Sequence, residues 1–205
     1  MRWLTLIFTL LLVLPSSALG AGYLRWDYGM TREQVQARSE HGPYYQFQNG
    51  DLGSQGGPFQ GHTVPISFYF RDDKLVRIML IPYMGDDAQA MDTAVRMAIT
   101  QLQEEFGGVE LPSSGQGRAT LDEVMAAYAA QVPLLAPGQR FQFGAHPMPE
   151  GHTVWVSVTA TGQGQYIVAL NYGESSPPMP SRKSLRKARR LIRGARGPAP
   201  PPQAG

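Results

Sequence analysis

The stretch VPISFYFRDDKLVRIMLI, residues 64–81, decides how the rest of the chain is interpreted. Its first part alternates, which places Val64, Ile66 and Phe68 on one face of a strand. The polar segment 71–74 predicts a tight turn. Residues 75–81 then return with apolar side chains on both faces, which is typical of a central strand covered on both sides. The stretch therefore predicts an antiparallel hairpin at the centre of a sheet.

Three helices are predicted around this hairpin. Thr31 and Thr120 are each followed three residues later by Gln or Glu, the spacing of a capping box, so a short helix should begin at each. Between them, apolar residues recur every three or four positions over residues 87–106. Asp86 and Asp87 can cap the start of this long helix, and Gly107 ends it.

Further short strands are expected on either side. They are residues 23–26, 44–48 and 140–144, and a second hairpin of 153–161 and 165–172. In that hairpin Val154, Val156 and Val158 share one face and Trp155 lies on the other. Residues 49–61 contain five glycines and a proline, which predicts a flexible loop. Phe59 in that loop is a candidate recognition residue, although such a segment is more often a plain connection.

These elements predict an α+β fold, an antiparallel sheet of hairpins with helices packed on one face. The two capping boxes also match as Thr-x-x-Gln/Glu-Val-x-Ala, at Thr31 and Thr120. A degenerate duplication of a helix-plus-strands unit would explain the match. Chance would too, because capping boxes are common.

Residues 1–20 have the pattern of a secretory signal peptide. Arg2 precedes about 12 apolar residues, and the small residues Ala18 and Gly20 stand at the −3 and −1 cleavage positions. A membrane-spanning helix needs about 20 apolar residues, so an uncleaved anchor is the weaker interpretation. The chain contains no cysteine, which excludes disulfides, a lipid-modified cysteine and thiolate metal sites. We expect export to the periplasm or the exterior, and the Ala, Arg, Pro and Gly bias indicates a bacterial source.

The net charge of +2 hides a strong asymmetry. Residues 21–174, expected to form a single domain, contain nine Lys and Arg against all sixteen Asp and Glu, a net charge of −7. Residues 175–205 contain eight basic residues and no acid, a net charge of +8, and their Pro-rich composition predicts disorder. The basic residues of this tail are Arg182, Lys183, Arg186, Lys187, Arg189, Arg190, Arg193 and Arg196.

Three interpretations of the tail remain open. Leu185, Ala188 and Ile192 are spaced for a thin apolar stripe, so the tail could lie as a helix on an anionic membrane or polymer. It could also contact the acidic domain of its own chain, or remain solvated without a specific partner. Nucleic acid is an unfavoured partner, because export separates the protein from most of it.

No catalytic motif stands out in the domain. The paired acids at 72–73, 86–87, 104–105 and 122–123 are explained as turn, cap and solvated helix positions. His146, Met148, Glu150 and His152 are the only cluster of potential ligands, and such groups can hold copper. A proline-stiffened connection explains the same residues more simply. We therefore assign no catalytic, cofactor or metal residue.

The segment Gly29-Met-Thr-x-x-x-Val35, followed by the hairpin ending Phe-x-Asp-Asp-x-Leu75, resembles a group of exported bacterial domains. The group includes the SmpA/OmlA-type outer-membrane assembly lipoproteins and the β-lactamase-inhibitor-protein fold. The resemblance implies a helix on an antiparallel sheet and a protein-binding role. It covers about 60 residues, and the missing lipid-attachment cysteine, the long helix 87–106 and the basic tail depart from it.

These observations favour an exported, non-enzymatic envelope protein that binds a protein or surface and has a cationic tail. Two alternatives remain open: an exported hydrolase that acts on an envelope polymer, with acids and histidines brought together from separate loops, and a structural domain without a ligand.

Overall fold

The computed structural model describes residues 23–111, 117–162 and 164–175. Contacts between residues divide the chain after Glu174, and the description below concerns the part before that point. The predicted signal peptide and the eight basic tail residues lie outside the described residues. No described helix is long and apolar enough to cross a membrane.

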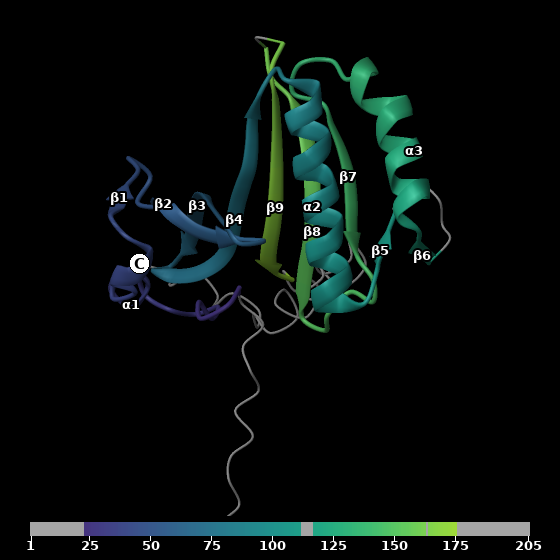
Figure 1. Cartoon of the computed structure of the whole chain (residues 1–205). Helices are drawn as coiled ribbons and strands as arrows, with labels where there is room; N and C mark the ends of the chain where they lie inside the picture. The colour runs from purple at the N-terminus through teal and green to yellow at the C-terminus, as the bar shows by residue number, and fades with distance from the viewer. Residues whose placement is uncertain (1–22, 112–116, 163, 176–205) are drawn as a thin grey trace, which may run out of the picture. The chain divides into compact units, whose positions relative to one another are not determined.

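Groups of antiparallel strands are separated by helices, of which α2 is the longest (Figure 1). The helices are α1 Arg32–Gln36, α2 Ala88–Phe106 and α3 Leu121–Gln131, with 3-10 turns η1 Ser39–His41 and η2 Val132–Leu134. The strands are β1 Tyr44–Gln46, β2 Leu52–Phe59, β3 His62–Arg71, β4 Lys74–Gly85, β5 Val109–Glu110, β6 Arg118–Ala119, β7 Arg140–Ala145, β8 His152–Ala160 and β9 Tyr166–Glu174.

All nine strands form one antiparallel sheet in the order β1-β2-β3-β4-β9-β8-β7-β5-β6. The predicted α+β class and both predicted hairpins are confirmed. The two halves share an element order: α1 leads through β1 into β2, β3 and β4, and α3 leads into β7, β8 and β9. Their last strands, β4 and β9, pair at the centre of the sheet. A duplication would produce this arrangement, and so would a chance likeness between two α+β halves.

The helix boundaries follow from local hydrogen bonds. Both predicted capping boxes form, at Thr31 and at Thr120. The Asp87 carboxylate accepts from the backbone N–H groups of Gln89 and Ala90 at 2.8 and 3.1 Å and so caps α2. Gly107 ends α2 with φ +88°, a conformation that glycine adopts without steric cost.

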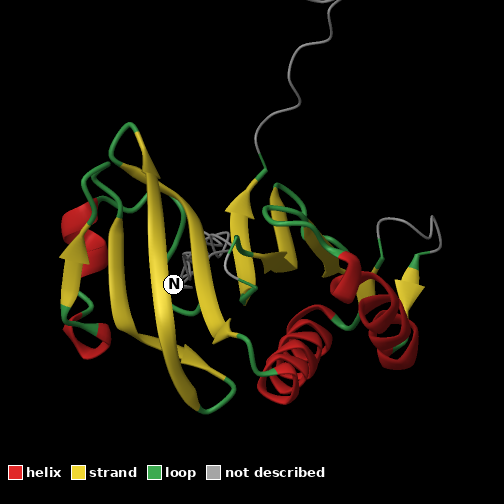
Figure 2. Cartoon of the chain, turned by 90° about the horizontal axis from the view of Figure 1, so that it is seen from above, coloured by secondary structure: helices red, strands yellow, loops and turns green. Residues whose placement is uncertain are grey.

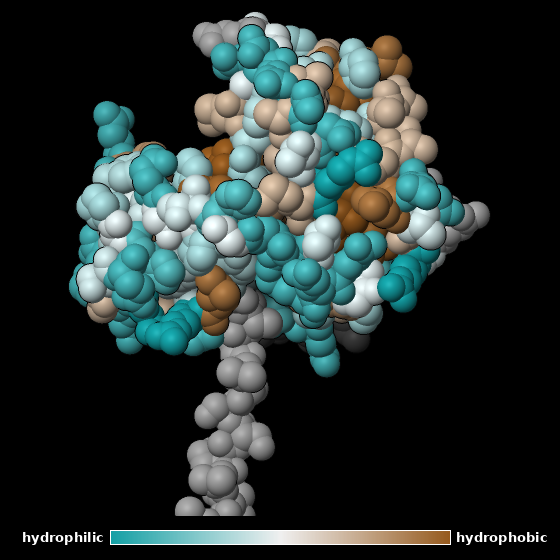
Figure 3. Space-filling model, in the orientation of Figure 1, coloured by the Kyte–Doolittle hydropathy of each residue, from teal (hydrophilic) through white to brown (hydrophobic). Residues whose placement is uncertain are grey.

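The helices pack on one face of the sheet, as predicted. α2 runs along the strands, over β4, β9 and β7, and α3 lies beside β7; Figure 2 shows both helices on the same side of the twisted sheet. Residues 23–30 cover the β1–β4 half of this face, where the buried Trp26 ring meets Phe68 edge-on at 4.9 Å. Figure 3 views the helix side: hydrophilic colours dominate its lower half, and the larger hydrophobic areas gather over α2 and α3. We call this side of the sheet the covered face.

The end of α2 is fixed to the sheet by a partly buried carboxylate. The Tyr172 hydroxyl on β9 donates a hydrogen bond to Glu105 at 2.7 Å. Burial raises the pKa of Glu105, although the hydrogen bonds from Tyr172 and Gln101 act in the opposite direction. The Tyr23 ring packs at a tilt against Tyr172 with centroids 4.7 Å apart, so the N-terminal segment and α2 meet over the same strand.

The prediction of a flexible loop at residues 49–61 is wrong, because most of this segment is strand β2. Its glycines allow neighbouring atoms to pack closely against the strand. A Cβ on Gly56 would lie 2.4 Å from the His41 backbone oxygen, and one on Gly57 would lie 2.7 Å from the Ile66 Cβ. Phe59 is 1% exposed at the end of this strand, so it is a core residue and not a recognition residue on a mobile loop.

Two smaller expectations also need correction. Residues 23–26 form a turn closed by a single bridge between Tyr23 and Trp26, not a strand, and both side chains are buried in the core. Strand β4 is central, but its faces differ. Ile78 and Leu80 are fully buried on the covered face, whereas Arg77 and Met79 on the other face are only half-buried.

Candidate functional site

No helix in the described part of the chain packs on the second face of the sheet, which we call the open face. Because residues paired across antiparallel strands share a face, the register defines an unbroken row across all nine strands. In spatial order the row is Tyr45, Gly53, Ser67, Met79, Asn171, Trp155, Gly144, Glu110 and Arg118. It combines aromatic, small polar and charged side chains, unlike the apolar covered face.

Aromatic side chains lie over glycines on this face. A Cβ on Gly53 would fall 2.5 Å from the Tyr45 ring, so only glycine leaves room for that ring, and Cζ3 of Trp155 lies 3.4 Å from the Cβ position of Gly173. Tyr45 is 43% exposed, and Phe47 packs edge-on against it at 5.2 Å and is 42% exposed. Exposed aromatic surface of this kind is typical of sites that bind other molecules.

An arginine lies in the middle of the open face. The Arg77 guanidinium stacks over the Tyr69 ring, 3.7 Å from its centroid. Arg77 pairs with Gly173 on β9, which pairs with Thr153 on β8. Arg77 therefore lies in the row next to the one that contains Trp155. Its Nε atom is buried and lacks a hydrogen-bond partner among the described residues, and Arg77 forms no ion pair with any of them.

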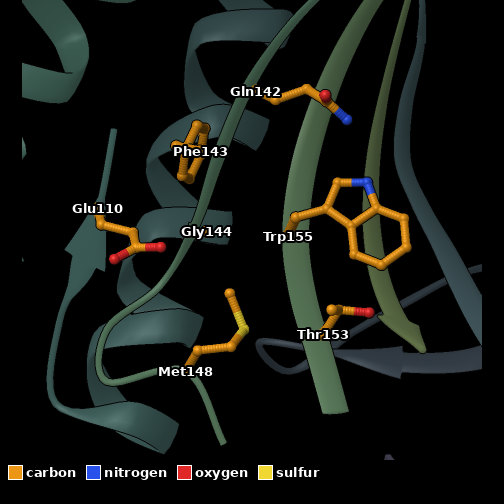
Figure 4. A pocket seen from close by; sticks show the side chains of 7 residues that line it. All are labelled: Glu110, Gln142, Phe143, Gly144, Met148, Thr153 and Trp155. Atoms are coloured by element: carbon orange, nitrogen blue, oxygen red, sulfur yellow. The ribbon is translucent and has the colours of Figure 1, made fainter. Parts of the chain in front are cut away.

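A hollow of about 400 Å³ opens at the β5–β7–β8 end of this face. Figure 4 shows Trp155 and Thr153 on β8, Gln142 on β7, the Glu110 carboxylate directed toward β7, and Met148 between the strands. We call this site the Trp155 hollow. The residues that line it are Glu110, Gln142, Phe143, Gly144, Met148, Thr153 and Trp155.

The Trp155 hollow exists because Gly144 has no side chain. Gly144 stands between Glu110 and Trp155 in the row, and neighbouring strands are about 4.8 Å apart. The two flanking side chains therefore start roughly 10 Å apart, and Gly144 itself puts no side chain between them. The Met148 methyl lies over this glycine, 3.2 Å from where its Cβ would be. The Met148 sulfur accepts from the Val154 backbone N–H at 3.2 Å, which holds the thioether in place.

His146 is the polar partner of Glu110. The Glu110 carboxylate lies 3.3 Å from Nδ1 of His146, and both side chains are about one-third exposed, at 36% and 35%. Glu110 is also the only carboxylate among the residues that line the hollow. The hollow thus presents one negative group, one indole, one amide and one hydroxyl.

The structure separates the other members of the histidine cluster. Met148 faces the hollow, whereas His152 stacks on Tyr28 with ring centroids 5.2 Å apart. Glu150 is exposed. Within the described ranges, no group of three or more His, Asp and Glu side chains is placed to hold a metal ion.

Sequence reasoning did not identify the Trp155 hollow, although part of its signal was visible. The alternation of β8 sets Trp155 apart from three buried valines, and a tryptophan on the outer face of a strand indicates a surface with a function. Glu110 and Gly144 carried no such signal. Their proximity depends on pairing between β5 and β7, which are 30 residues or more apart in the chain.

The open face can recognise a ligand by stacking, by charge and by hydrogen bonding. Aromatic rings and an arginine are typical of interfaces that bind tightly. A two-carboxylate hydrolytic mechanism needs a second acid facing Glu110, and the lining residues supply one acid only. Compared with known proteins, the chain matches no family model, no curated protein and no solved structure.

Proposed function

We propose that the protein is an exported, non-enzymatic cell-envelope protein that binds another protein through the open face. The observation that carries the proposal is the set of partly exposed side chains on the open face, with Tyr45 at one end of the row and Trp155 and Glu110 toward the other. Between them, Ser67 and Asn171 are buried. The signal-peptide pattern in residues 1–20 supports export. Under this proposal the cationic tail adds a separate attachment to an anionic surface.

Stability alone does not explain the residues of the open face. A sheet face without a function, when exposed to water, is expected to carry scattered polar side chains. Here Tyr45 and Phe47 form an exposed aromatic pair, and Met148 is 38% exposed in the hollow. Exposed apolar groups of this kind are stabilised when a partner removes them from water, at about 25 cal/mol for each Å² buried.

Site-specific photo-cross-linking in the native host tests the proposal. A benzoyl-phenylalanine replaces Gln142 on the open face, and a second strain carries it at Ala126, an exposed position on α3. We expect one discrete protein adduct from position 142 and none from position 126. The adduct should disappear when Trp155→Ala is added, because the indole supplies much of the contact area. Equal adducts from both positions would contradict a role for the open face.

The tail is tested separately. Removing residues 175–205 deletes eight cationic side chains and no acid. Each such charge near an anionic surface contributes up to about 1 kcal/mol, and salt weakens it. We expect the full mature chain to bind phosphatidylglycerol-containing vesicles at low salt and the truncated chain to lose this binding. Binding that survives truncation would rule out the tail as the attachment.

A further inference from the structure

We propose that the Trp155 hollow is a recognition site for one arginine side chain of the partner protein. This inference rests on the proposed function, because it names the group that the open face binds. The ligand class follows from three features of the hollow: its charge, its aromatic wall and its spare hydrogen-bond acceptors.

The charge of the hollow favours a cation. Glu110 is the only ionisable group that lines it. His146 lies 3.3 Å from its carboxylate, and Arg118 is its neighbour in register on β6. The domain that carries the hollow has a net charge of −7 over residues 21–174. A cationic partner segment is therefore attracted both by the local carboxylate and by the domain as a whole.

The aromatic wall favours a flat cation. Trp155 is the best of the aromatic side chains for a cation–π contact. Its indole lies along the sheet, over Gly173 on β9 and on the side of β8 away from Glu110 (Figure 4), and it is one of the residues that line the hollow. The same face already contains one such contact, between Arg77 and Tyr69. A guanidinium can stack on the indole while its edge remains free for hydrogen bonds.

The acceptors favour arginine over lysine. A guanidinium offers five N–H donors in a planar fork, and a carboxylate accepts two of them together. Glu110 supplies the carboxylate, and the Gln142 amide oxygen and the Thr153 hydroxyl can accept others. The Met148 methyl over Gly144 forms an apolar floor for the aliphatic stem of the side chain.

The protein offers an internal probe for this site. Once residues 1–20 are removed, Trp26 and Trp155 are the only tryptophans. Trp26 is 0% exposed in the core, whereas Trp155 lines the hollow. In a ¹H–¹⁵N spectrum of residues 21–205, the two indole N–H signals therefore report on the hollow and on the fold separately.

The test is a titration with the peptide acetyl-Gly-Arg-Gly-amide. The same peptide with citrulline, which is neutral and nearly the same shape, is the matched control. We expect the arginine peptide to shift the Trp155 signal with a dissociation constant of about 1 mM, and the Trp26 signal to stay in place. The lysine peptide should bind on the order of fivefold more weakly, and the citrulline peptide should give no saturable shift.

Two variants locate the site. Glu110→Gln removes the charge and should weaken the arginine peptide by about tenfold. Gly144→Val fills the hollow and should abolish binding, while an unchanged Trp26 signal confirms that the variant is folded. Asp122→Asn removes the same charge from the exposed start of α3 and should bind as the wild type does.

Equal shifts from arginine and citrulline peptides, or full affinity in Glu110→Gln, would overturn the inference. So would a Trp155 shift caused by a neutral N-acetylglucosamine oligomer and not by the arginine peptide. If the peptide fails while cross-linking at position 142 still yields a Trp155-dependent adduct, this inference falls and the proposed function stands. If both experiments fail, both proposals fall.

Discussion

Gly57→Ala offers a sharp test of the finding that the glycine-rich segment is a packed strand. The added methyl carbon would lie 2.7 Å from the Ile66 Cβ and 2.8 Å from the Val64 backbone oxygen. Non-bonded carbon atoms are most favourably about 3.5–4.0 Å apart, so strands β2 and β3 must move apart by about 1 Å. Overpacking of this kind costs about 1–3 kcal/mol. The midpoint of thermal unfolding should fall by about 2–4 °C for each kcal/mol lost.

The opposite outcome is expected if residues 49–61 were a flexible loop. There, Gly→Ala would restrict the unfolded chain and stabilise the protein by about 0.4–1 kcal/mol. Gly162→Ala is the matched control, because no described atom lies within 4 Å of its Cβ position. Urea unfolding of residues 21–205, followed by the fluorescence of Trp26 and Trp155, gives both free energies. A Gly57→Ala protein as stable as Gly162→Ala would refute the packing argument.

Two further predictions concern the helices. Burial raises the pKa of Glu105, so the folded protein binds the proton of this carboxyl more tightly than the unfolded chain does. The stability that this group contributes is therefore present at low pH and is lost as the pH rises through the pKa of the folded protein. Glu105→Gln should therefore be more stable than wild type in urea near pH 8, with the difference shrinking toward about pH 4; a gain that grows at low pH would contradict this sign. Thr120→Ala removes the capping box of α3 and should cost about 1 kcal/mol in the same assay, whereas Asp122→Ala, which leaves the box intact, should cost only a few tenths.

Features specified by neighbouring residues could be predicted from the sequence. Thr31 and Thr120 cap their helices through side chains three residues away, and Gly107 ends α2 by its own backbone conformation. The hairpin at residues 64–81 was readable because alternation and a polar turn lie within one short stretch. In each case the decisive interaction spans only a few residues.

Features that depend on distant packing could not be predicted. Gly56 and Gly57 look like loop residues, and only the close approach of His41 and Ile66 shows why a side chain cannot stand there. Phe59 follows these glycines closely, so the sequence alone places it in the loop as well. The Trp155 hollow likewise depends on the register that sets Glu110, Gly144 and Trp155 in one row. None of these residues is unusual in its own neighbourhood of the sequence.

The two edge strands of the sheet are short: β1 has three residues and β6 has two. Short edge strands offer few free N–H and C=O groups to which an incoming extended chain could add itself. Partners that recognise their targets by strand addition need a longer edge than this. Under the proposed function, a partner is therefore held by its side chains on the open face, so its specificity should depend on which side chains it presents and little on whether its own backbone is extended or helical.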